Sequence, residues 1–264
     1  MTADIDAYRI TSPPYYQAVN DECELFDAAY AQRLPILLKG PTGCGKTRFI
    51  EYMAWRLRRP LITVACNDDT SAADLTGRWL LAAEGTRWQD GPLTLAARLG
   101  AICYLDELVE ARADTMVVIH PLSDSRRVLP LDKRTEVVRA HSDFLLVASY
   151  NPTVHKEMKP STRQRFCALA FQYPSTEVEV AIVAHESGVS QEMATRLVAL
   201  GVRTRRLQGH GLDEGASTRM LVHAGQLICR GVSPLAACRM AVATPLSDEP
   251  EIAVALLATV EASF

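Results

Sequence analysis

Short apolar runs alternate with helix-like segments through the first two thirds of the chain. Each run is apolar at consecutive positions, which is typical of strands buried on both faces of a parallel sheet. A helical pattern from Gly45 to about Arg58 follows the first run. Alternation of this kind favours right-handed β-α-β crossovers, so we predict an α/β domain with helices on both faces of the sheet. The runs lie at 34–39, 60–66, 101–106, 144–149 and 167–173.

Two segments interrupt this alternation and are expected to form β-hairpins inserted in the parallel-sheet core. The segment 78–93 has strand-like ends around the turn residues "EGT". The segment 126–140 has a similar pattern, with its turn near Asp132 and Lys133. The predicted core therefore carries two hairpins in addition to its parallel strands.

The pattern becomes wholly helical after Pro174. Ser175 or Thr176 is a suitable N-cap for a helix that stops at Gly188. We therefore predict two domains, an α/β nucleotide-binding domain over 1–174 and an all-α lid domain over 175–264. Further helices are expected at 190–206, 214–230, 233–243 and 249–261.

Composition narrows the classes of function. The chain has 264 residues, of which 48% are apolar and 22% charged, as in ordinary globular proteins. The 28 basic residues face 31 acidic ones, and this balance argues against binding nucleic acid mainly through phosphate charge. No apolar run reaches the length of about 18 residues expected of a membrane span. The polar, acidic N-terminus lacks the features of a signal peptide, so we expect a cytoplasmic protein. Seven cysteines without C-x-x-C spacing favour free thiols over a zinc site or disulfides.

The stretch "GPTGCGKT" matches the phosphate-binding pattern G-x-x-x-x-G-K-[ST], and it has the required strand before it and helix after it. Backbone N–H groups and the helix N-terminus are expected to surround phosphate oxygens of ATP. Lys46 is expected at the β- and γ-phosphates, and the Thr47 hydroxyl at Mg²⁺. The expected ATP-binding residues are Gly40, Pro41, Thr42, Gly43, Cys44, Gly45, Lys46 and Thr47.

A second feature, "AICYLDEL", places two acids at the end of an apolar strand. Ligands of open α/β sheets bind at the carboxyl ends of the strands, so both acids are expected beside the phosphate loop. Asp106 would bind Mg²⁺ and Glu107 would polarise the attacking water. Acids also end strands without any function, but their position after a phosphate loop favours a functional role. The Asp-Glu pair fits a hydrolase better than a small-molecule kinase.

Four more residues are candidates for contact with the γ-phosphate. Asn151 follows the next apolar strand, where its amide can position a water; the alternative is a turn asparagine before a proline. Arg163 and Arg165 precede the last strand and can act on a neighbouring subunit's nucleotide, as arginine fingers do; the alternative is a solvated basic turn. Arg219 opens a helix of the second domain, or is an ordinary surface arginine.

The order of these elements resembles that of AAA+ ATPases, and the two hairpins resemble the MoxR branch. The strings "PLITVACNDD", "WQDGPLT", "VVIHPLSD", "KPSTRQRF" and "GHGLDEGASTR" are similar to those of the CbbQ/NirQ/NorQ group. The resemblance implies that Asp106 and Glu107 are the Mg²⁺-binding and catalytic acids and that Asn151 is sensor 1. It also implies that Arg163 or Arg165 is a trans-acting finger and that Arg219 is sensor 2.

The resemblance further implies a homo-hexameric ring that uses ATP hydrolysis to remodel another protein. Such rings work with an adaptor that carries a von Willebrand factor A (VWA) domain, similar to CbbO. The target implied first is Rubisco blocked by inhibitory sugar phosphates, and the alternative target is nitric oxide reductase. A P-loop small-molecule kinase and a DNA-dependent motor are more distant alternatives.

Other polar and aromatic side chains allow two interpretations. Trp79, Arg87 and Trp88 in the first predicted hairpin either contact a substrate or pack the hairpin. His120 and His141 are expected to be structural rather than metal ligands.

Overall fold

The computed structural model describes the chain except residues 1–4, 84, 153–155, 157 and 210. The fold comprises two compact units, of which the first is Met1–Gly40 with Lys46–Ala170. The second is Pro41–Gly45 with Phe171–Phe264, so most of the phosphate loop belongs to it. Each unit has its own hydrophobic core.

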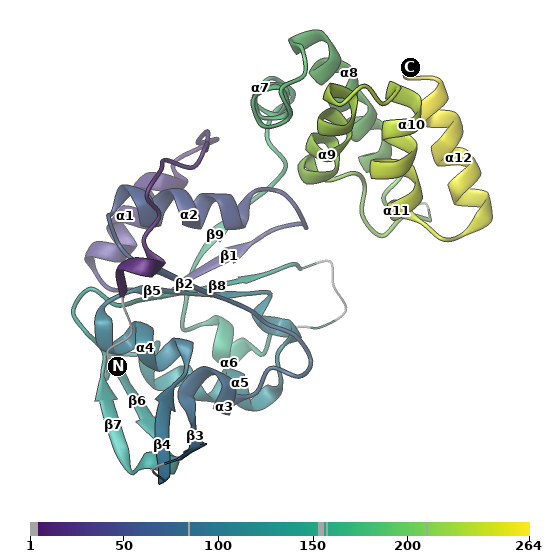
Figure 1. Ribbon diagram of the computed structural model, residues 1–264. Coiled ribbons are helices and arrows are strands. Elements are labelled where there is room, and N and C mark those ends of the chain that lie inside the picture. Colours follow the sequence, from purple (N-terminus) through teal and green to yellow (C-terminus); the bar gives the residue numbers. More distant parts are fainter. Residues whose placement is uncertain (1–4, 84, 153–155, 157, 210) are drawn as a thin grey trace. The chain divides into compact units, whose positions relative to one another are not determined.

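The first unit is built on a five-stranded sheet with the order β2-β5-β8-β1-β9, in which all neighbouring strands are parallel (Figure 1). The predicted parallel sheet is therefore confirmed. Every residue of β8 is buried, as is all of β5 except its last residue, which explains their unbroken apolar sequences. The strands are β1 Ile36–Lys39, β2 Leu61–Ala65, β5 Ile102–Asp106, β8 Leu145–Tyr150 and β9 Cys167–Ala170.

Helices cover both faces of this sheet, as predicted. Figure 1 shows α1 (Glu22–Ala31) and α2 (Lys46–Arg56) on one face. The opposite face carries α3 (Ala72–Thr76), α4 (Pro92–Leu99) and α5 (Ala113–Val118). The predicted hairpin segment 78–93 extended too far, because Pro92 already occupies the first turn of α4. A short helix, α6 (Pro160–Arg163), lies just before β9 in the chain.

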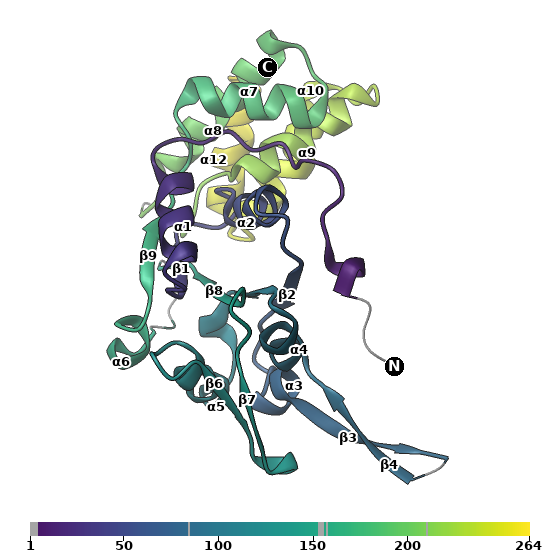
Figure 2. The same cartoon turned by 90° about the vertical axis from the view of Figure 1, so that its left-hand side faces the viewer.

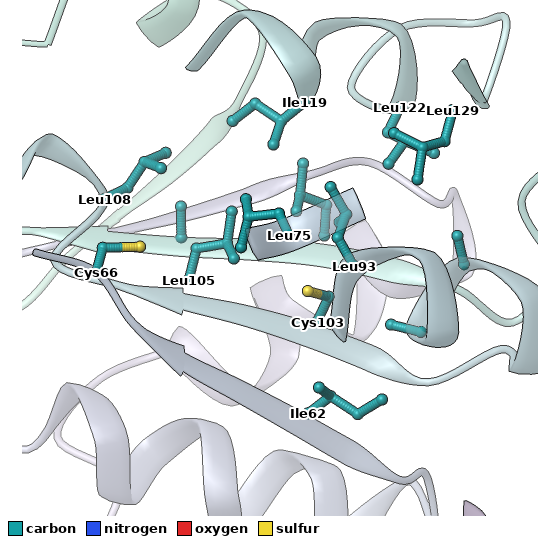
Figure 3. Close-up of a cluster of buried hydrophobic side chains, with 14 of the residues drawn as sticks. Ile62, Cys66, Leu75, Leu93, Cys103, Leu105, Leu108, Ile119, Leu122 and Leu129 are labelled. Carbon is teal, nitrogen blue, oxygen red and sulfur yellow. The ribbon is translucent and has the colours of Figure 1, made fainter. Parts of the chain in front are cut away.

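One cluster of buried side chains in the first unit lies between the sheet and the helices α3, α4 and α5. Cys103 and Leu105 of β5 share this side of the sheet with Leu75 of α3 and Leu93 of α4 (Figure 3). All four side chains are fully buried. Burial raises the pKa of the Cys103 thiol, which therefore remains a neutral apolar group in the core.

Both predicted hairpins are present as two-stranded antiparallel ribbons. Strands β3 (Gly77–Ala82) and β4 (Gly85–Asp90) form the first, and β6 (Val128–Leu131) and β7 (Glu136–Arg139) form the second. They extend from the sheet on the side of α3, α4 and α5 (Figure 2). The second hairpin turns at a 3₁₀ turn over Asp132–Arg134, where the prediction placed it. Glu84, in the predicted turn of the first hairpin, lies outside the described residues.

Short 3₁₀ turns complete the first unit. They are η1 Ile5–Tyr8, η2 Leu108–Glu110, η3 His120–Leu122 and η4 Asp132–Arg134.

The second unit consists of helices in its described residues 171–209 and 211–264, with one isolated bridge between Gln208 and Leu212. Serine N-caps begin several of these helices, since each accepts a hydrogen bond from the backbone N–H of the third helical residue. The structure selects Ser175 over Thr176 as the first cap, and that helix ends at Gly188 in the left-handed conformation. The helices are α7 Thr176–Ser187, α8 Gln191–Arg205, α9 Thr218–Cys229, α10 Pro234–Cys238, α11 Thr244–Leu246 and α12 Pro250–Glu261.

Two helix predictions in the second unit were wrong in detail. The helix expected from residue 214 begins only at Thr218, because Gly215 lies against the end of α8: a Cβ there would sit 2.4 Å from the Cα of Arg205. The helix expected over 233–243 changes to a π-helical turn over Arg239–Ala243 after α10 ends at Cys238.

Candidate functional site

The carboxylate of Asp106 lies at the carboxyl end of β5 and is held by two hydroxyl donors. The Tyr104 hydroxyl donates to its Oδ1 at 2.6 Å, and the Ser149 hydroxyl donates to the same oxygen at 2.5 Å. Burial, followed by the nearby charge of Asp106, raises the pKa of Tyr104, which therefore stays protonated as a donor. The other oxygen, Oδ2, is left facing the Thr47 hydroxyl at 3.4 Å.

Glu107 adopts a backbone conformation that is rare for a residue with a side chain. Its φ of 53° and ψ of 48° lie in the left-handed region, which costs free energy outside glycine. The Glu107 N–H donates to the Ser149 hydroxyl oxygen at 2.9 Å, which helps to hold this conformation. Its side chain is exposed beside the half-buried Asp106. One serine hydroxyl therefore joins both acids.

Asn151 directly follows β8, the strand next to β5 in the sheet, and is 4% exposed. The register pairs Leu105 with Ala148, so the ends of the two strands lie at the same edge of the sheet. The structure therefore places Asn151 at the sheet edge that carries the two acids, as expected from the sequence.

The phosphate loop, Gly40–Thr47, links β1 to α2. Lys46 begins α2 and is 8% exposed, and its ammonium group donates to the Gly40 carbonyl at 2.8 Å. Gly43 and Gly45 have φ of +68° and +103°, which only glycine adopts without strain. Cys44 between them is buried, so its side chain does not occupy the loop's outer surface.

Arg219 lies next to the loop residue Gly43 within the second unit. A Cβ added to Gly43 would lie 3.6 Å from the Cβ of Arg219 and 2.6 Å from that of Ser217. Ser217 is also the N-cap of α9, and Arg219 is in the first turn of this helix. The predicted sensor arginine therefore stands beside a loop residue expected to touch phosphate.

The two arginines before β9 have different surroundings. Arg165 pairs with Asp124, its Nη1 lying 3.3 Å from Oδ2. The hydrogen bond from Arg126 and the charge of Arg165 hold the pKa of Asp124 at about 2. Arg163, the last residue of α6, has an exposed side chain and forms no ion pair within the described residues.

The two tryptophans of the first hairpin pack against each other, although Trp79 remains 49% exposed. Trp79 and Trp88 form an edge-to-face pair with ring centroids 5.6 Å apart. The Trp79 indole N–H donates to the carbonyl of Lys133 in the second hairpin at 3.0 Å, and that of Trp88 donates to Asp90 at 2.7 Å. Arg87 is exposed.

The two histidines expected to be structural, His120 and His141, each contact a neighbouring polar group. His120 Nε2 lies 3.0 Å from the Thr162 hydroxyl, and the His141 ring accepts from the Asp143 N–H at 3.1 Å. In the parts of the chain that the structure describes, no group of three or more His, Cys, Asp and Glu side chains is placed to hold a metal ion. Within the same residues, no helix has the length and apolar character needed to cross a bilayer.

Sequence reasoning missed Ser149 and Tyr104, which organise the acids. A signal was present: each is a polar side chain within an apolar strand, and both are fully buried. Buried polar groups are almost always hydrogen-bonded, so each implied a partner at the strand end.

Comparison with known families and structures agrees with this geometry. The family model described as "AAA domain (dynein-related subfamily)" matches residues 35–166, and "CbbQ/NirQ/NorQ C-terminal" matches residues 179–263. A mutant of RuvB from Thermotoga maritima has a similar fold, with a TM-score of 0.58 at 13% identity over 95% of this chain and 73% of that one. A putative ATPase from Cytophaga hutchinsonii matches with a TM-score of 0.51 at 14% identity, over 91% and 81% of the two chains.

The phosphate loop, the strand-ending acids and the parallel sheet thus define an AAA domain protein with a P-loop. Sequence relatives narrow the class. Protein CbbQ of Hydrogenophilus thermoluteolus is 63% identical over 97% of both chains. The denitrification regulatory protein NirQ of Pseudomonas aeruginosa is 55% identical over 94% of this chain and 96% of its own. Protein NorQ of Paracoccus denitrificans is 54% identical over 90% of both. The chain belongs to the CbbQ/NirQ/NorQ group of the AAA family.

Proposed function

We propose that the protein hydrolyses ATP and uses the energy to remodel a target protein. The observation that carries this proposal is the Ser149 hydroxyl, which holds Asp106 and the backbone of Glu107 together. This arrangement keeps one carboxylate oxygen of Asp106 toward Thr47 and leaves the Glu107 carboxylate exposed to attract a water. Two acids with distinct surroundings serve a hydrolase, which must hold a cation and also activate water.

The residues present fit a Mg²⁺ ion accompanying ATP. The Thr47 hydroxyl and Asp106 carboxylate supply hard oxygen donors, and Mg²⁺ usually takes few protein ligands besides water and phosphate oxygens. When bound, Mg²⁺ supplies charge neutralisation at the β- and γ-phosphates. Asp106 is proposed to hold it through water, and Thr47 directly.

The other site residues divide the remaining tasks. Backbone groups of Gly40–Thr47 bind the phosphates, and Lys46 neutralises their charge. Glu107 orients and polarises the attacking water with help from Asn151, the proposed sensor 1. Arg219, next to Gly43, is proposed as sensor 2.

We infer that the active site is shared between subunits of a homo-hexamer, with Arg163 as the trans-acting finger. Arg165 is paired with Asp124 of its own chain, so it is better suited to fix the conformation of this segment. The exposed Arg163 is two residues away and can reach a neighbouring subunit. A finger must leave its own surface to stabilise charge at another site.

Mixing two inactive variants tests this arrangement. Arg163→Ala removes the finger but leaves Glu107, and Glu107→Gln removes the catalytic acid but leaves Arg163. If the finger acts in trans, mixed rings contain sites with both residues, and ATP hydrolysis returns when the two variants are combined. Arg165→Ala mixed with Glu107→Gln is the matched control. Activity that stays absent in every Arg163→Ala mixture, while the Arg165→Ala mixture recovers, would reverse the assignment.

We propose Rubisco blocked by inhibitory sugar phosphates as the target, recruited by a VWA-domain adaptor similar to CbbO. The higher identity to a CbbQ protein than to the NirQ and NorQ proteins supports this choice. The second candidate is nitric oxide reductase, because NirQ and NorQ relatives remain 54–55% identical. We also propose that the protein is cytoplasmic, with a nucleotide-binding domain over 1–174 and a helical lid domain over 175–264.

Reactivation of inhibited Rubisco tests the target. The protein, the adaptor and ATP are added to Rubisco carrying a tight-binding sugar phosphate, and carboxylation is followed. The proposal expects recovery that requires all three components and that fails with Glu107→Gln. If the same preparation instead restores activity only to immature nitric oxide reductase, the Rubisco assignment is wrong.

A further inference from the structure

A buried ion pair connects helices α7 and α8 within the second unit. The Glu179 side chain is 1% exposed and accepts from Nη1 and Nη2 of Arg205 at 2.7 and 2.6 Å. This is the bidentate geometry that only arginine provides. A buried ion pair is a weak source of stability, because desolvation offsets its Coulomb attraction. The role of this ion pair is therefore better explained by the geometry that it imposes on its neighbours.

The same pair holds the start of helix α9. The Thr218 hydroxyl donates to Glu179 Oε1 at 2.6 Å, and Arg205 Nε donates to the Ala216 carbonyl at 2.8 Å. Residues on both sides of Ser217 are thus tied to one ion pair. Arg219 follows immediately, so the position of its backbone is set by these bonds.

The pair also connects to the phosphate loop through Tyr173. The Arg205 guanidinium carbon lies 3.8 Å from the centre of the Tyr173 ring, and the Tyr173 hydroxyl donates to the Thr42 carbonyl at 3.0 Å. Burial is the largest cause that raises the pKa of Tyr173 to about 12, so this hydroxyl keeps its proton near neutral pH.

These contacts close into a ring. From Thr42 the ring runs through Tyr173, Arg205, Glu179 and Thr218, and the residues beside Thr218 return to the loop at Gly43. All these residues belong to the second unit. The loop is therefore held at two successive residues by the group that positions Arg219.

We propose that Tyr173, Arg205 and Glu179 are positioning residues that hold Arg219 in register with the phosphate loop. None of them needs to touch nucleotide, since they act through Arg219 and Thr42. This inference rests on the proposed ATP hydrolysis and on the role of Arg219 in it. It predicts that damage to the ion pair lowers turnover in the same way as loss of Arg219 itself.

A double-mutant cycle tests this inference. Arg205→Lys keeps the charge but loses the bidentate pairing, and we expect turnover to fall on the order of 10- to 100-fold, as small misplacements of a catalytic group do. In an Arg219→Ala background the same substitution should change turnover by less than about twofold, because residues that act as a unit are not additive. If the two substitutions acted independently, their fold-losses in turnover would instead multiply.

A matched control lies on the same helix. Arg196 in α8 stacks over Phe264 at 4.7 Å and donates to the Ser263 carbonyl at 3.1 Å, yet lies outside the ring of contacts. Arg196→Lys should leave turnover unchanged. Thermal melting of each variant checks folding. If Arg205→Lys does not fold, Tyr173→Phe, which removes one hydroxyl and keeps the ring, is used in the same cycle.

The outcomes separate this inference from the proposed function. If the unaltered protein does not hydrolyse ATP, or Arg219→Ala is fully active, the proposed function or its sensor is wrong. If Arg219→Ala is impaired but Arg205→Lys and Tyr173→Phe match the unaltered protein, this inference alone is wrong. Multiplicative losses in the double variant would also overturn it.

Discussion

Replacing Ser149 with alanine removes the hydroxyl that joins the two acids. The Asp106 carboxylate loses a donor at 2.5 Å, and the Glu107 N–H loses its acceptor at 2.9 Å. A hydrogen bond to a charged group is worth about 1.5–3 kcal/mol, and one between neutral groups about 0.5–1.5 kcal/mol. Ser149 is fully buried, so little water replaces these bonds. We expect the free energy of unfolding to fall by about 2–4 kcal/mol.

The effect on activity should exceed the effect on folding. Glu107 keeps its left-handed backbone only while its surroundings compensate the strain, so loss of the Ser149 acceptor lets the carboxylate move. A displacement of about 1 Å can cost up to 100-fold in rate. ATP turnover should therefore fall at least tenfold, while ATP binding through the phosphate loop is kept.

The assay compares Ser149→Ala with Ser187→Ala in turnover, nucleotide binding and chemical denaturation. Ser187 is a suitable control because it is also buried and also donates one hydrogen bond and accepts one, but neither involves a carboxylate. Its variant should hydrolyse ATP at the unaltered rate. If Ser149→Ala turns over ATP as fast as Ser187→Ala, the idea that this hydroxyl organises the acids is refuted.

Three further changes test separate parts of the structure. Gly43→Ala places a Cβ 2.6 Å from that of Ser217 at a positive φ, so we expect the free energy of unfolding, measured by denaturation, to fall by about 1–3 kcal/mol. Nucleotide binding, measured by a fluorescent-nucleotide titration, should weaken, and unchanged binding would contradict the loop geometry. Trp79→Phe removes the indole hydrogen bond between the hairpins and should lower the free energy of unfolding in urea by about 0.5–1.5 kcal/mol. An unchanged unfolding midpoint would show that this hydrogen bond does not stabilise the protein. The hydrogen bond from Arg126 lowers the pKa of Asp124 from 3.8 to about 2, so its contribution to stability is complete above about pH 4 and lost as the pH falls through about 2. Asp124→Asn should reduce this acid-dependent loss of stability in denaturant titrations, and an identical loss in both proteins would contradict the assignment.

The parallel sheet and the phosphate loop were predictable because their signals are local. Consecutive apolar residues identify buried strands, and the loop needs glycine and lysine at fixed spacing. The role of Ser149 was not predictable in this way, because it depends on the register between β5 and β8. That register pairs Leu105 with Ala148, which brings Asp106 opposite Ser149, 43 residues away in sequence.

The ends of the helices show the same difference between local signals and tertiary contacts. Ser175 and Gly188 bound α7 through their own caps, and the sequence predicts both ends. Helix α9 starts four residues later than its helical pattern, because Gly215 lies against Arg205 of another helix. Tertiary contact overrode the helical pattern there, although Ser217, the N-cap of α9, is a local signal for the later start.

The most direct test of the central claim is ATP hydrolysis by Glu107→Gln beside the unaltered protein. The substitution keeps the size of the side chain and removes the carboxylate that is proposed to polarise water. We expect turnover to fall by at least about 100-fold while ATP binding, measured by equilibrium titration, stays within about twofold. If Glu107→Gln hydrolyses ATP at the rate of the unaltered protein, Glu107 is not the catalytic acid and this account of the site is wrong.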